Sequence, residues 1–168
     1  GKRLQTTTIG DPNLEGVRMG SLAGKSQVKE VTEKIALLAK SQQIIYDGRD
    51  AMELKGGDKD KGSFLAPVIF LNASPFKNLD AHNVEAFGPV STIMPYKTID
   101  DAIALSRLGK GSLVSSIITS KNKKAKQYVL GAASSHGRIL VLNKDCAKES
   151  TGHGSPMPLL VHGGPGRA

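Results

Sequence analysis

Glu85 and Phe87 are the two residues whose types and spacing point most directly to chemistry. They stand two positions apart, just before a strand expected from Val90, so both side chains can face one cleft at the start of that strand. There the carboxylate can accept hydrogen bonds from two neighbouring ribose hydroxyls while the phenyl ring packs on a flat heterocycle, and Gly88-Pro89 fix the turn. The alternative is a surface glutamate beside a core phenylalanine, which composition alone favours because carboxylates are mostly exposed and phenylalanines mostly buried.

Cysteine and histidine offer few further candidates. Cys146 is the only cysteine, which excludes an internal disulfide and fits a reducing, cytoplasmic location. His153 stands in a loop rich in glycine and serine and is a candidate substrate contact, although histidines in such loops more often hydrogen-bond the backbone. The cysteines and histidines show no metal-ligand spacing, so we expect no metal site.

The net charge of +8 indicates an anionic partner, such as nucleic acid, phosphate or an acidic cofactor. The dense basic cluster at Lys121, Lys123, Lys124 and Lys126 is typical of a solvated helix face. A basic, non-enzymatic nucleic-acid-binding domain is the alternative from another class. The chain has no tryptophan, 4% aromatic residues and no recognisable nucleic-acid module, so we expect no nucleic-acid partner.

The elements that would position Glu85 and Phe87 alternate between strand and helix. We expect strands at residues 44–46, 67–71, 90–96, 113–119 and 138–142, an exposed loop at 53–63, and a long ordered loop beyond Leu142. Helices are expected within residues 24–43, after Thr98, whose hydroxyl can cap the first turn, and after Ser120. This order predicts the α/β class, with an open, mostly parallel sheet and flanking helices.

The 168 residues suit one domain. No apolar run approaches the ~18 residues that a membrane-spanning helix needs, and the basic start is followed by threonines rather than by the apolar stretch of a secretion signal. We therefore expect no membrane partner.

The order and spacing of several motifs over nearly all of the chain resemble the catalytic domain of aldehyde dehydrogenases. The motifs are Gly10-Asp11-Pro12, Met19-Gly20-Ser21-Leu22, Gly62-Ser63-Phe64-Leu65-Ala66-Pro67, Glu85-x-Phe87-Gly88-Pro89, Gly111-Ser112-Leu113 and the strand Gly137-Arg138-Ile139-Leu140-Val141-Leu142-Asn143. Two of them depart from the family pattern, since Ser21 stands where proline is usual and Gly111-Ser112-Leu113 is an altered form of a Tyr-Gly-Leu turn.

The resemblance implies that residues 1–168 are part of an aldehyde dehydrogenase catalytic domain and that the dinucleotide-binding domain is absent from them. By the same resemblance, Glu85 holds the nicotinamide ribose of NADP or NAD, Phe87 packs near the nicotinamide, and Leu113 lies close to the same pocket. The nucleophilic cysteine and general-base glutamate of the family precede the Gly-Asp-Pro segment, and no cysteine occurs before Cys146. We therefore expect no catalytic residue within this chain and no activity from it alone.

The loop at residues 149–156 and the tail at 162–167 resemble a subgroup of the family found in bacterial aromatic-acid catabolism. These domains oxidise a ring-opened semialdehyde attached to coenzyme A, and in the phenylacetate pathway the domain is fused to an enoyl-CoA hydratase domain. A benzoate-pathway semialdehyde dehydrogenase is the alternative. The resemblance implies an aldehyde substrate linked to CoA, and the positive net charge would then attract the CoA phosphates. It also implies a homo-oligomer in the full-length protein.

Overall fold

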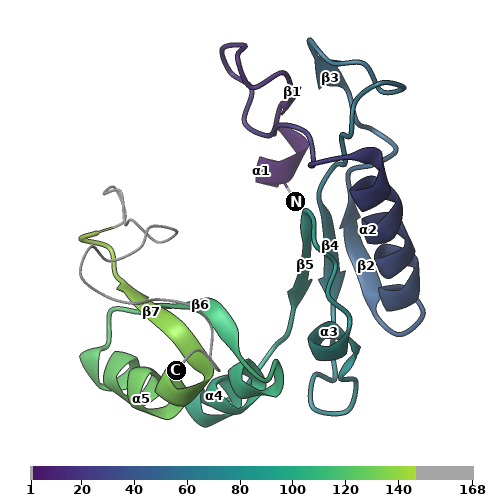
Figure 1. The fold of residues 1–168 in the computed structure, drawn as a ribbon. Helices are drawn as coiled ribbons and strands as arrows, with labels where there is room; N and C mark the ends of the chain where they lie inside the picture. The colour runs from purple at the N-terminus through teal and green to yellow at the C-terminus, as the bar shows by residue number, and fades with distance from the viewer. Residues whose placement is uncertain (1, 147–168) are drawn as a thin grey trace. The chain divides into compact units, whose positions relative to one another are not determined.

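The computed structural model describes residues 2–146, which form two compact units divided at Pro95 (Figure 1). The first unit is Gly1–Pro95, and the second begins at Tyr96. Each unit combines parallel strand pairs with helices, so the predicted α/β class is confirmed. Whether residues 1–168 act as one domain stays a prediction.

The core of the first unit lies between one helix and a three-stranded sheet. The strands β2 (Gln43–Asp47), β4 (Val68–Leu71) and β5 (Val90–Ile93) lie in the order β2-β4-β5, with β5 parallel and β2 antiparallel to β4. The helix α2 (Lys25–Leu38) contributes apolar residues at spacings of three and four, which form one face. The buried cluster between helix and sheet consists of Val31, Ile35, Leu38, Leu65, Val68 and Phe70.

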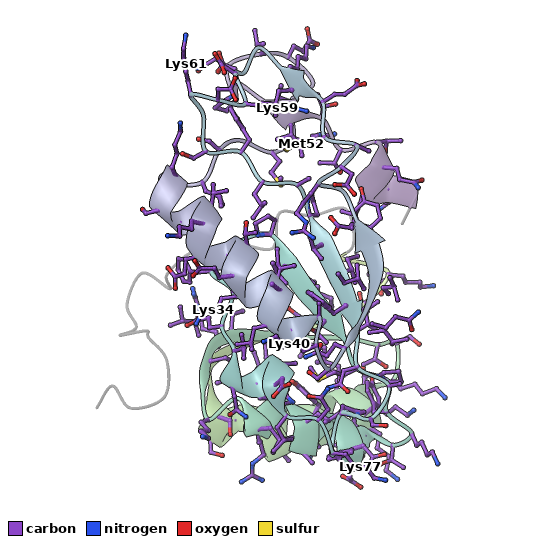
Figure 2. The ribbon with its side chains drawn as sticks, turned by 90° about the vertical axis from the view of Figure 1, so that its right-hand side faces the viewer. Lys34, Lys40, Met52, Lys59, Lys61 and Lys77 are labelled. Carbon is purple, nitrogen blue, oxygen red and sulfur yellow. The ribbon has the colours of Figure 1, made fainter. Side chains whose placement is uncertain are left out.

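Short elements complete the first unit. The helix α1 (Lys2–Gln5) precedes β1 (Ile9–Gly10), which pairs in parallel with β3 (Leu54–Lys55), and α3 (Asp80–Asn83) connects β4 to β5. The exposed loop expected at residues 53–63 is present, although it contains β3, and Lys59 and Lys61 extend outward from it (Figure 2).

In the second unit, two helices pack with a pair of parallel strands. The strands β6 (Ser112–Ile118) and β7 (His136–Leu142) pair in parallel, and α4 (Ile99–Leu108), α5 (Asn122–Ala132) and the short 3-10 helix η1 (Ala133–Ser135) complete the unit. The buried cluster consists of Ile103, Ile117, Tyr128 and Ala132, with Ile99 and Ile139 packed against it.

The expected strands and helices are present, with differences at their ends. The strand expected at residues 90–96 ends at Ile93, two residues before Pro95, whose ring removes a backbone donor. The prediction that Ser120 opens a helix is wrong by one residue, because the N-cap of α5 is Lys121. The Lys121 side chain forms no capping hydrogen bond. Among residues 2–146 the strands form three separate sheets rather than one. The loop expected beyond Leu142 lies mostly outside the described residues.

Candidate cofactor site

The segment that carries Glu85 and Phe87 connects α3 to β5 and alternates between core and solvent. Ala86 packs against the buried cluster of the first unit, and Glu85 is exposed. Phe87 is 70% exposed, so the alternative of a core phenylalanine is wrong. Glu85 and Phe87 therefore flank a partly buried residue that packs on the core, and both of their side chains are exposed. That the carboxylate and the ring face one cleft stays a prediction.

Gln27 on α2 anchors this segment, and sequence reasoning missed it. Its Nε2 donates to the carbonyl oxygen of Phe87 at 2.6 Å, and its Oε1 accepts from the backbone N–H of Ala23 at 2.9 Å. One side chain therefore ties the start of α2 to the residue that carries the exposed ring. The two ends of the contact are 60 positions apart, so no local pattern signals it.

Gly88 lets the same segment approach α2 closely. A Cβ atom at this position would lie 2.9 Å from Cγ2 of Val31, closer than real Cβ contacts allow. Val31 is fully buried, so the helix has little freedom to move away. Because it lacks a side chain, Gly88 lets the backbone next to Phe87 lie directly against Val31 of α2.

Leu113 belongs to the second unit, near the start of β6, and is 61% exposed. The residue before it, Ser112, lies with its Oγ 2.5 Å from Nδ1 of His136, the first residue of β7. Burial lowers the pKa of His136, which favours its neutral ring. Sequence reasoning missed this pair as well, since the two residues are 24 positions apart.

Cysteine, metal-binding and membrane-spanning features were also considered in the sequence. Cys146 is a free, partly buried thiol whose Sγ accepts from the backbone N–H of Asn143 at 3.2 Å. Among residues 2–146, no three histidine, cysteine, aspartate or glutamate side chains come together to hold a metal ion. The same residues form no helix with the length and apolar character needed to cross a membrane. His153 lies outside the described residues.

A cavity of about 420 Å³ in the first unit contains none of the predicted site residues. Its lining includes Thr6, Thr7, Asp47, Met52 and Glu53, and Met52 is labelled in Figure 2. Neither lysine, arginine nor histidine lines it. Since phosphate sites use cationic side chains or backbone N–H groups at helix N-termini, this cavity is poorly suited to the phosphates of a dinucleotide.

Comparison with known proteins connects these features to one family. The model described as "Aldehyde dehydrogenase family" matches residues 1–149. The chain belongs to the aldehyde dehydrogenase family. Among the curated relatives, Protein MaoC of Klebsiella aerogenes is 42% identical over 153 residues, covering 89% of this chain and 43% of that protein. The 3,4-dehydroadipyl-CoA semialdehyde dehydrogenase of Aromatoleum evansii is 34% identical over 163 residues, covering 97% of this chain and 32% of that enzyme.

Solved aldehyde dehydrogenases share the fold. An NAD-dependent aldehyde dehydrogenase from Sinorhizobium meliloti superposes with a TM-score of 0.68 at 22% identity, covering 83% of this chain and 26% of that one. A 3,6-anhydro-L-galactose dehydrogenase superposes with a TM-score of 0.73 at 17% identity, covering 97% of this chain and 31% of that one. The chain thus spans less than half the length of these relatives.

Proposed function

We propose that the natural protein carrying this chain is an NAD(P)-dependent aldehyde dehydrogenase that oxidises a CoA-linked semialdehyde to the acid in bacterial aromatic-acid catabolism, by way of the phenylacetate pathway. Membership of the aldehyde dehydrogenase family supports the reaction class. The single observation that carries the site is the outward presentation of Glu85 and Phe87 from one segment anchored on α2.

In this proposal, Glu85 and Phe87 hold the nicotinamide half of NAD or NADP. The Glu85 carboxylate accepts hydrogen bonds from the ribose hydroxyls, and the exposed ring of Phe87 packs near the nicotinamide. Leu113, on β6 of the second unit, is a separate candidate for an apolar contact with the cofactor. These residues orient the cofactor, which when bound supplies the hydride acceptor.

The chemistry follows the family's covalent route. A thiolate attacks the aldehyde carbon to give a thiohemiacetal, loss of hydride from that carbon gives a thioester, and water hydrolyses the thioester to the acid and the free thiol. The nucleophilic cysteine of the family precedes the Gly-Asp-Pro segment, whereas Cys146 follows the strand β7. We therefore assign the nucleophile to a cysteine outside this chain. We therefore expect residues 1–168 alone to be inactive.

The substrate class rests on the relatives and on charge. One relative is named for a CoA semialdehyde, and the net charge of +8 suits the phosphates of coenzyme A. A benzoate-pathway semialdehyde is the alternative substrate. We also propose a cytoplasmic homo-oligomer. His153 stays a candidate substrate contact.

The decisive experiment measures cofactor-dependent turnover of the natural protein on a CoA-linked semialdehyde, comparing wild type with Glu85→Ala. Hydrogen bonds to a charged group contribute about 1.5–3 kcal/mol each, so loss of the carboxylate should raise the KM for the cofactor roughly ten- to a hundred-fold. Glu53→Ala is the matched control, because Glu53 is an exposed carboxylate at the cavity and has no part in the proposed site.

Unchanged cofactor KM in Glu85→Ala would mean that the motif is misassigned. Absence of turnover in the wild-type protein with CoA semialdehydes, combined with tight and salt-sensitive binding of DNA or RNA, would instead favour the nucleic-acid alternative.

A further inference from the structure

We propose that the cavity of the first unit binds a small organic molecule that carries a primary ammonium group. The cavity has a volume of about 420 Å³, which is within the range of small-molecule sites. Its lining comes from residues 4–9, 46–48, 51–53 and 66–67, all of which belong to the first unit. The inference is independent of the proposed function, because none of the predicted cofactor residues lines the cavity.

Two threonines of the lining can accept hydrogen bonds from a ligand but not donate them. The hydroxyls of Thr6 and Thr7 both donate to the backbone carbonyl oxygen of Arg3, each at 3.1 Å. A hydroxyl has a single proton, so each of these groups has only acceptor lone pairs left for a ligand. Among residues 2–146, no lysine, arginine or histidine lines the cavity. A ligand bound by these side chains must therefore supply the donors.

Asp47 brings a negative charge to the lining. Its side chain is 26% exposed, and hydrogen bonds from Arg49 hold its pKa below the ordinary value, so the carboxylate is ionised at neutral pH. Oδ1 accepts from the backbone N–H of Arg49 at 3.1 Å and from its Nε at 2.9 Å, whereas Oδ2 accepts only from Nη2, at 2.6 Å. A carboxylate has about four acceptor positions, so Oδ2 keeps one for a ligand. Arg49 itself does not line the cavity.

Tyr46 adds a second kind of acceptor. A Cβ atom at Gly48, a buried residue of the same lining, would lie 3.1 Å from the Tyr46 hydroxyl, which places that hydroxyl beside the cavity wall. It forms no hydrogen bond within residues 2–146. An ammonium group has three N–H donors and no acceptor. Its donors match the free acceptor positions of Thr7, Tyr46 and Asp47.

The test titrates the natural protein with putrescine and with 1,4-butanediol, which has the same carbon chain but no charge. Isothermal titration calorimetry measures both Kd values. We expect putrescine to bind at least about ten-fold more tightly, because hydrogen bonds to a charged group are the stronger ones. The net charge of +8 repels a dication, so the overall charge of the chain cannot produce this preference. Equal affinity for the two probes, or no binding of putrescine, would overturn the proposal.

Three variants locate the bound putrescine. Tyr46→Phe removes one acceptor and Asp47→Asn removes the charge, so each should weaken the binding of putrescine, Asp47→Asn by about ten-fold. Arg49→Leu should have the opposite effect, since it frees the Asp47 carboxylate from its partner, and we expect binding about ten-fold tighter. A variant that had lost its fold would lose affinity rather than gain it, so the Arg49 variant separates the site from simple unfolding.

Asp60→Asn is the matched control for Asp47→Asn. Asp60 is an exposed carboxylate of the same unit that does not line the cavity, so the Kd for putrescine should change less than about two-fold. An equal loss of affinity in Asp60→Asn and Asp47→Asn would show that putrescine responds to the general surface charge. That result, or unchanged or weaker binding in Arg49→Leu, would overturn the assignment of Asp47 as the group that holds the ammonium ion.

Discussion

At the residue scale, the side chains that fix the Glu85–Phe87 segment in place are different from those proposed to contact the cofactor. Gln27 binds the carbonyl oxygen of Phe87 and the N–H of Ala23 with the two ends of its amide. Val31 and Gly88 add close packing behind the same segment. The outward directions of Glu85 and Phe87 therefore follow from contacts made on the opposite side of the chain.

Gln27→Leu should loosen this segment in the natural protein. It removes the donor to Phe87 and the acceptor for Ala23 while keeping a side chain of similar length. With about 1 kcal/mol for the bond to Phe87, we expect the cofactor KM to rise about five-fold. Steady-state kinetics with varied cofactor measures the change.

The control for Gln27→Leu is Ser26→Ala, since Ser26 is the exposed neighbour on α2. It should leave the cofactor KM unchanged. Equal kinetics in Gln27→Leu and wild type would show that the Phe87 segment keeps its place without Gln27.

At the element scale, the two long helices of the second unit begin in different ways. Thr98 caps α4 by accepting from the backbone N–H of Asp101 at 3.1 Å, and the Asp101 carboxylate accepts from the backbone N–H of Thr98 at 2.9 Å. These hydrogen bonds to Thr98 lower the pKa of Asp101. In contrast, the N-cap of α5, Lys121, forms no side-chain capping bond, and the first turn of α5 has no acidic residue. The start of α4 therefore has stabilising contacts that the start of α5 lacks.

Thr98→Ala should destabilise the chain by about 1 kcal/mol, the usual effect of losing a threonine N-cap. The hydroxyl is the acceptor for an otherwise unpaired donor of the first turn, so its removal weakens α4 at its start. Denaturant unfolding followed by circular dichroism measures the difference.

Lys121→Ala is the matched variant at the N-cap of α5. No side-chain cap is lost there, and one positive charge is removed from the positive end of the helix dipole. We expect no loss of stability. A destabilisation equal to that of Thr98→Ala would contradict the assignment of the capping contact.

At the scale of the whole molecule, each unit holds one described histidine whose pKa is lowered by burial. His82 lies in α3 of the first unit and His136 in β7 of the second, and the Nε2 atoms of both are buried without a hydrogen-bond partner in the structure. Their neutral forms are therefore favoured in the folded chain, whereas in the unfolded chain each titrates near its ordinary pKa of about 6.5.

The free energy of unfolding should fall as the pH drops from about 7.5 to about 5.5. Below pH 6.5 the unfolded chain binds more protons at these two positions than the folded chain does, so acid favours unfolding. Hydrogen bonds to Arg49 and to Thr98 hold the pKa values of Asp47 and Asp101 below the ordinary value for aspartate, so these carboxylates titrate below this range. Urea midpoints at the two pH values test the expectation.

The double variant His82→Asn, His136→Asn supplies the comparison, since asparagine does not titrate. Its urea midpoint should depend less on pH than that of the wild type. An equal dependence in the two chains would place the acid sensitivity elsewhere in the molecule.

Local signals in the sequence determined most of the elements. The apolar spacing of α2 and the capping hydroxyl of Thr98 act through neighbours three or four positions away, and β4 is a continuous apolar run, so all three can be read without the fold. The spacing of Glu85 and Phe87 is a local signal too, and both side chains are exposed. The motifs around them were enough to indicate the family.

Only the tertiary structure decided which distant residues meet. Gln27 and Phe87 are 60 positions apart, Ser112 and His136 are 24 apart, and neither pair belongs to a periodic pattern. The antiparallel placement of β2 beside β4 likewise depends on the path of the chain between them. Such contacts form because the buried clusters bring whole elements together, and the side chains that meet at their ends have no local cause that a sequence pattern could reveal.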